Sequence, residues 1–180
     1  MTAVNMKTHA LLSFSVALLS AVGAAGCVGI EADLPDVEVT QRGIVFPGVA
    51  AGEQSMATSF SQDHKKIDFS DGLDSEVRTL SVSLRATSGV ADLAFIHHLR
   101  ILMAPDDGSG AAVELGAYEP AAGATVGDEI QLSTLNPINV FSAWNADRAK
   151  FMVEIVGALP DHDWTGDVTA HFAGKLKYAY

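Results

Sequence analysis

Apolar and polar residues alternate along most of the chain after residue 36, and the clearest alternation runs from residue 77 to residue 87. One set of alternate positions holds Leu80, Val82, Leu84 and Ala86, and the other holds Thr79, Ser81, Ser83, Arg85 and Thr87. Successive side chains of a β-strand point to opposite faces of its sheet. The pattern therefore predicts a strand with its apolar face on the core and its polar face in water.

Shorter alternating or apolar stretches occur at 37–40, 44–46, 55–61, 99–103, 113–115, 130–132, 149–156 and 168–176. Segments rich in Gly, Pro, Asn and Asp, the residues that favour turns, separate many of them. Many short strands with turns between them are typical of a sandwich or a small barrel. The sequence predicts one all-β domain, an antiparallel β-sandwich of the immunoglobulin-like type with about seven to nine strands.

The first 27 residues have a different pattern. Residues 10–22 read ALLSFSVALLSAV, Lys7 lies upstream, and the small residues 24–26 precede Cys27, the chain's one cysteine. A basic residue, a short apolar run and a small-residue cleavage site are typical of a secretory signal. A transmembrane helix over 10–26 is marginal against the ~20 apolar residues that a span needs. A buried free thiol at Cys27 is the other alternative.

The segment Ala24-Ala25-Gly26-Cys27 resembles the lipobox of a bacterial lipoprotein precursor. The resemblance implies that Cys27 becomes the acylated first residue of the mature chain and attaches it to a membrane. The domains would be a signal peptide at 1–26, a lipidated tether at 27–36 and the sandwich at 37–180. Val28 stands where many inner-membrane lipoproteins of enteric bacteria carry Asp, so the resemblance favours the outer membrane.

Composition excludes one class of partner. The chain has 180 residues and a net charge of −11, and removal of residues 1–26, which contain one Lys and no acid, leaves 154 residues with a charge of −12. Nucleic-acid binding depends largely on Lys and Arg that neutralise phosphates, so we expect no nucleic-acid partner. With Cys27 acylated, no disulfide forms within the chain, and the hydrophobic core must stabilise the domain.

Motifs that carry chemistry are scarce. The sequence has no G-x-S-x-G, no H-E-x-x-H, no phosphate loop and no C-x-x-C. Four potential metal ligands, Asp161, His162, Asp163 and Asp167, occur within seven residues before the last strand. Carboxylates and an imidazole could bind Zn²⁺ or Ca²⁺, although such residues are also common in turns. A divalent cation is the one cofactor that the sequence suggests.

Two other clusters are weaker candidates. His97 and His98 are adjacent, so their side chains diverge on a strand or on a helical turn and do not readily share one ion. The acidic group Asp68, Asp71, Asp74 and Glu76 fits a solvated hairpin end, with calcium binding as the alternative.

The sequence thus predicts a lipid-anchored envelope lipoprotein, not an enzyme, whose β-sandwich binds or scaffolds an envelope protein or ligand. The alternative is a lipoprotein that binds a ligand or a metal ion through the Asp161–Asp167 loop. A β-sandwich hydrolase is the third reading, and a titratable pair in a deep pocket would favour it.

Overall fold

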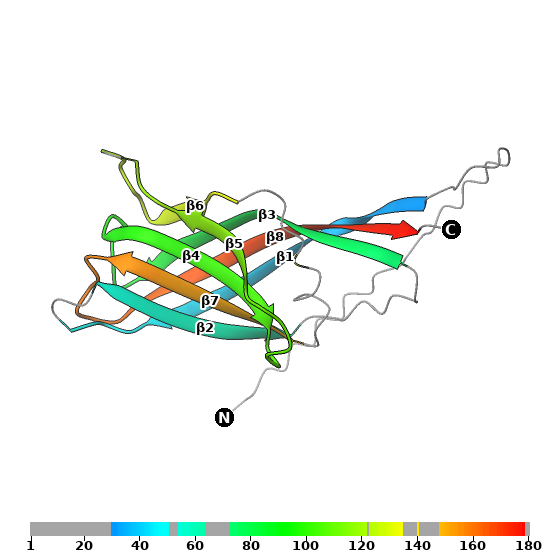
Figure 1. The fold of residues 1–180 in the computed structure, drawn as a ribbon. Coiled ribbons are helices and arrows are strands. Elements are labelled where there is room, and N and C mark those ends of the chain that lie inside the picture. Colours follow the sequence, from blue (N-terminus) through cyan, green and yellow to red (C-terminus); the bar gives the residue numbers. More distant parts are fainter. Residues whose placement is uncertain are drawn as a thin grey trace, which may run out of the picture.

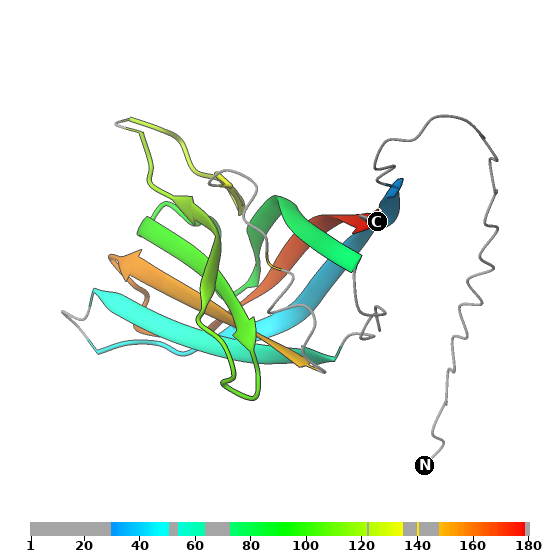
Figure 2. The ribbon, with the colours of Figure 1, turned by 45° about the vertical axis from the view of Figure 1, so that its right-hand side comes forward.

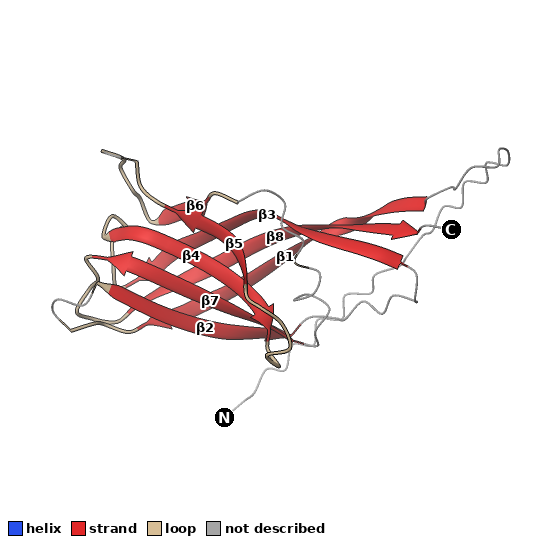
Figure 3. Ribbon diagram, viewed as in Figure 1, coloured by secondary structure: helices blue, strands red, loops and turns tan. Residues whose placement is uncertain are grey.

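The computed structural model describes residues 30–50, 54–63, 73–121, 123–134, 140 and 148–178. Cys27, Asp68 and Asp71 lie outside these residues. Strands dominate the described part of the chain (Figure 3). They are β1 (Ile30–Phe46), β2 (Ser55–Asp63), β3 (Leu73–Ser88), β4 (Ile96–Pro105), β5 (Val113–Tyr118), β6 (Glu129–Leu132), β7 (Arg148–Gly157) and β8 (Trp164–Tyr178). No helix in this part has the length and apolar character needed to cross a membrane.

The strands form two antiparallel sheets that face each other (Figures 1 and 2). Sheet A has the order β1-β8-β3-β6, and sheet B has the order β2-β7-β4-β5. The predicted antiparallel β-sandwich is confirmed. The order of strands is that of an eight-stranded jelly roll, in which the first and last strands are neighbours, and differs from the immunoglobulin order of ABED and CFG sheets.

One core lies between the sheets and is built by alternate residues of each strand. In β7, Phe151, Val153 and Ile155 are almost fully buried while the residues between them are partly exposed. The rings of Phe46 and Trp164 stack with their centroids 4.0 Å apart, at the end of sheet A where β1 finishes and β8 begins. The alternation read from the sequence thus identifies the core positions of this strand.

The prediction for residues 77–87 is confirmed at one end and wrong at the other. Val82, Leu84 and Ala86 are buried as expected. Leu80, however, is 50% exposed, and Thr79 is 7% exposed. The pairing of β3 with β8 shifts register between Thr79 and Ser81. Such a bulge inserts one residue and reverses which alternate positions face the core.

The predicted tether at 27–36 is wrong for residues 30–36, because β1 begins at Ile30 and pairs with the end of β8. β1, β3 and β8 are 17, 16 and 15 residues long, whereas no strand of sheet B exceeds 10. Sheet A therefore projects past sheet B as a three-stranded ribbon (Figure 1). We call its outer part, residues 30–34, 73–77 and 174–178, the ribbon end.

The opposite end of the sandwich carries three connections that pack together, which we call the loop end. They are residues 47–50 after β1, 89–95 between β3 and β4, and 158–163 between β7 and β8. The amide of Val49 donates to the carbonyl of Pro160 at 3.0 Å. A Cβ on Gly48 would lie 2.6 Å from the backbone of Asp161, so these loops approach more closely than a side chain would allow.

Candidate functional site

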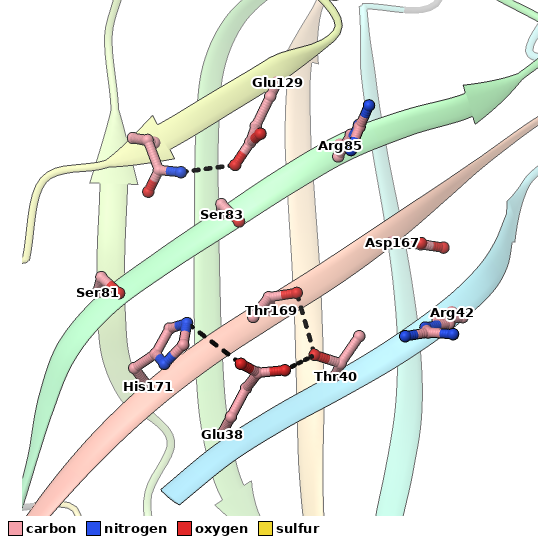
Figure 4. Close-up of a pocket in the computed structure, with 11 residues that line it drawn as sticks. Glu38, Thr40, Arg42, Ser81, Ser83, Arg85, Glu129, Asp167, Thr169 and His171 are labelled. Carbon is pink, nitrogen blue, oxygen red and sulfur yellow. Dashed lines mark hydrogen bonds and ion pairs between the residues drawn. The ribbon is translucent and has the colours of Figure 1, made fainter. Parts of the chain in front are cut away.

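The outer face of sheet A carries a polar hollow of about 450 Å³. Because alternate residues of each strand point away from the core, all four strands of the sheet contribute to it. The lining residues are Glu38, Thr40 and Arg42 on β1, Ser81, Ser83 and Arg85 on β3, Glu129 and Gln131 on β6, and Asp167, Thr169 and His171 on β8 (Figure 4). Every one of these side chains is polar or charged.

Hydrogen bonds connect β1 to β8 across the hollow. Thr40 and Thr169 are register partners, and their hydroxyl oxygens lie 3.2 Å apart. The Thr40 hydroxyl donates to Glu38 Oε1 at 3.0 Å. Since a hydroxyl has one proton, Thr169 must then donate to Thr40. His171 Nε2 lies 3.8 Å from Glu38 Oε2, which completes a polar ladder along this side of the hollow.

The other side of the hollow holds separate polar pairs. Gln131 donates to Glu129 at 2.6 Å, and Arg85 Nε lies 3.3 Å from Asp128 Oδ2 at the rim. Arg42 has no ion-pair partner among the described residues. Figure 4 shows the labelled side chains of the hollow spread along the sheet rather than converging on one point. The arrangement offers hydrogen-bond donors and acceptors side by side on a surface that is mostly polar.

The structure does not bring the four predicted metal ligands together. Asp163 Oδ1 accepts from the amide of Gly48 at 2.9 Å, and Asp167 Oδ1 accepts from the amide of Gly43 at 2.8 Å. Asp161 contacts the ring of its neighbour His162. No group of three or more His, Cys, Asp or Glu residues in the described ranges is arranged to hold a metal ion. The structure therefore does not support a metal site at these four residues, because their carboxylates are hydrogen-bonded to different parts of the chain.

His162 joins two connections of the loop end. Its Nδ1 lies 3.0 Å from Asp161 Oδ1, and its Nε2 lies 2.9 Å from the carbonyl oxygen of Gly89. Both partners are acceptors, so both ring nitrogens donate when the imidazole is protonated. The hydrogen bond to Asp161 is the largest cause, and the hydrogen bond to the Gly89 carbonyl the second, of a pKa of His162 that is raised above 6.5. The same hydrogen bond lowers the pKa of Asp161 below 3.8.

This bridge predicts a pH-dependent stability. Because the pKa of His162 is higher in the folded protein than in the unfolded chain, its protonated ring contributes its full stability below about pH 6.5, the unfolded value. This stability is lost as pH rises through the pKa of the folded state. The Asp161 contribution is present above its unfolded pKa and disappears as pH falls through its lowered folded pKa. We expect the stability difference between the wild type and His162→Ala, measured by urea unfolding, to be larger at about pH 5.5 than at about pH 8.5.

The control is the Asp161→Asn variant. An NMR titration of the ring protons should give a lower pKa for His162 in this variant than in the wild type, because the amide carries no charge and is a weaker partner. An unchanged pKa would contradict the proposed bridge.

The remaining candidates are separated. His97 is exposed, whereas His98 is half-buried with Nδ1 3.3 Å from Glu119 Oε1. Glu76 pairs with Arg78 at 2.7 Å. Asp74 belongs to β3, but its side chain is not among those described, and Asp68 and Asp71 lie outside the described residues.

Sequence reasoning placed Ser81, Ser83 and Arg85 on an outer strand face but did not identify the hollow. It missed seven lining residues, which are Glu38, Thr40, Arg42, Glu129, Gln131, Thr169 and His171. Each is an outward polar residue in a predicted strand or beside one, so the available signal was the polar half of the alternation. That signal does not say which strands are neighbours.

Comparisons with known proteins add little. No family model matches the chain, and no curated protein matches it. Among solved structures, the chain is similar to one from Desmodium yellow mottle tymovirus, with a TM-score of 0.34 and 11% sequence identity. That match covers 92% of this chain and 96% of the other. A similarity at this level carries no argument about function.

Proposed function

We propose that this protein is a lipid-anchored lipoprotein of the bacterial envelope whose jelly-roll domain binds a hydrophilic envelope component through the outer face of sheet A. The polar hollow is the observation that carries the binding role. The resemblance of Ala24-Ala25-Gly26-Cys27 to a lipobox supports the anchor, and the Val28 that follows supports the outer membrane.

The chemistry of the hollow favours binding over catalysis. Enzymes of the hydrolase type use titratable groups that converge on a reacting atom in a pocket. Here Glu38 accepts from Thr40, Glu129 accepts from Gln131, and Asp167 accepts from a backbone amide. These carboxylates lie on three different strands and are each engaged with a neighbour. We therefore assign them a recognition role and not an acid–base role.

The same chemistry points to a polyhydroxylated ligand. Neighbouring strands repeat every ~4.8 Å, which places donors and acceptors at a spacing that ligand hydroxyl groups can bridge. The lining contains two arginines against three carboxylates, and Asp128 adds a fourth at the rim. This balance disfavours polyanions such as nucleic acids. A neutral or weakly charged glycan of the envelope fits best.

Binding can be tested by co-sedimentation of the protein with purified, insoluble envelope glycan. Ser83→Asp places a carboxylate in the middle of the hollow, and we expect it to weaken binding about tenfold, equivalent to ~1.4 kcal/mol. The matched control is Ser59→Asp, which makes the same change at an exposed position of β2 on the other sheet. Equal binding by both variants, or no binding by the wild type, would overturn this role for the face.

The anchor can be tested by the Cys27→Ser variant. We expect the wild type to fractionate with membranes and the variant to accumulate as an unprocessed precursor or a soluble exported protein. Each buried CH₂ contributes ~0.8 kcal/mol, so several acyl chains make a durable anchor where one is marginal. A variant that is cleaved before residue 27 and fractionates with membranes as the wild type does would contradict acylation at this residue.

A further inference from the structure

The ribbon end gathers three distant parts of the chain at one end of the molecule. Ile30, the first residue of β1, is the register partner of Tyr178, the last residue of β8. Leu73, the first residue of β3, is also paired with Tyr178. In Figure 1 the blue start of β1, the red arrowhead of β8 and the start of β3 lie together, far from the loop end. The chain therefore enters the fold at the tip of the projecting sheet.

The residue proposed to carry the lipid is very close to this tip in the sequence. Only Val28 and Gly29 separate Cys27 from Ile30. Three residue steps extend no more than about 11 Å. A flexible tether over 27–36 would let the domain turn freely, but residues 30–34 are instead the first part of β1 and pair with β8. The lipid would thus be joined almost directly to a strand.

We infer that the ribbon end faces the lipid bilayer and that the strands of sheet A point away from it. This inference rests on the acylation of Cys27 proposed above. The loop end then lies farthest from the membrane, since the 17 residues of β1 span roughly 50 Å. The two residues between Cys27 and Ile30 restrict the tilt of the domain relative to the membrane. The position of β1 in the fold therefore determines the orientation.

The charges of the ribbon end are compatible with this position. Lys175 Nζ lies 3.7 Å from Asp33 Oδ1, and Lys175 is also the register partner of Glu76. The three segments of the ribbon end together contain four acids and two lysines, a net charge of −2; these are Glu31, Asp33, Asp74, Glu76, Lys175 and Lys177. Charge alone would therefore weakly repel the ribbon end from anionic head groups, so the acyl chains must hold it at the surface.

The orientation also sets the height of the polar hollow. Glu38 and Arg42 are eight and twelve residues from Ile30 along β1. At ~3.3 Å per residue, the hollow spans roughly 25–40 Å from the tip of the ribbon. A glycan bound there would be held beyond the lipid head groups and would run across sheet A.

The test uses the acylated mature protein, residues 27–180, in phosphatidylcholine vesicles. Some of the lipid carries a nitroxide on its head group, which quenches nearby fluorophores. Acylation of Cys27 leaves no free thiol, so a single introduced cysteine can be labelled specifically with a fluorophore. Lys175→Cys reports on the ribbon end and Ala158→Cys on the loop end, and both positions are exposed. We expect quenching to be several-fold stronger at 175 than at 158.

Equal quenching at the two positions, or stronger quenching at 158, would overturn the orientation. A second variant inserts ten Gly and Ser residues between Gly29 and Ile30 to create a flexible linker. It should reduce the difference between the two labels, and an unchanged difference would show that the short connection does not orient the domain. The mass of residue 27 is measured first, because an unacylated protein refutes the proposed anchor rather than this inference.

Discussion

Val82→Asp is expected to lower the free energy of unfolding by about 4 kcal/mol or more. Val82 is fully buried on β3, between β6 and β8, and its register partners Leu132 and Ala170 are also buried. A carboxylate there would lose its hydration and find no cation. Many domains have a total stability of about 5–15 kcal/mol, so this loss would be a large fraction of it and the variant could fail to fold. The measurement is therefore denaturant unfolding, with soluble yield as a second readout.

Ser83→Asp is the matched control for this variant. Ser83 is the next residue on the same strand, but it faces the polar hollow and is partly exposed. We expect a change within about 0.5 kcal/mol, as for most surface substitutions. Similar losses at both positions would mean that the alternation of β3 does not define an inner and an outer face.

Gly157→Ala is expected to destabilise the domain by about 3 kcal/mol through overpacking. A Cβ on Gly157 would lie 1.9 Å from the carbonyl oxygen of Phe95, so the backbone would have to move. That movement would disturb two hydrogen bonds that flank the site, Gly157 N to Gln54 O at 2.8 Å and Ala158 N to Phe95 O at 2.9 Å. Thermal or denaturant unfolding measures the loss.

Gly127→Ala separates this effect from the ordinary cost of replacing glycine. A Cβ on Gly127 meets nothing within 4 Å, and its backbone has no positive φ. We expect a neutral or slightly stabilising change, because alanine restricts the unfolded chain more than glycine does. Equal destabilisation by the two substitutions would argue against the close approach of β7 to the segment before β4.

The sequence allowed the class of fold to be predicted but not its topology. Alternation identified Val82 and Leu84 as core residues, since burial depends on the local period of the strand. It could not show that β1 pairs with β8, because pairing joins residues more than a hundred positions apart. The bulge between Thr79 and Ser81 adds one residue to one strand, and a regular alternation gives no sign of it.

The candidate site likewise combines features that the local sequence pattern predicts with features that depend on long-range strand pairing. Ser83 was placed on a polar strand face, but the hollow forms only where that face meets Thr40 and Thr169, which are 129 residues apart in sequence. The Asp161–Asp167 segment was rich enough in ligand atoms to suggest a metal. Its carboxylates contact backbone groups of Gly48 and Gly43, from the other end of the chain, and no local pattern identifies such partners.

The central claim is that Cys27 anchors this binding domain to a membrane. The most direct measurement is the mass of the N-terminal peptide of the mature protein isolated from bacterial membranes. The account predicts that the mature chain begins at Cys27 and that this residue carries acyl chains. A mature chain that begins elsewhere, or a Cys27 peptide with the mass of an unmodified thiol, would contradict it.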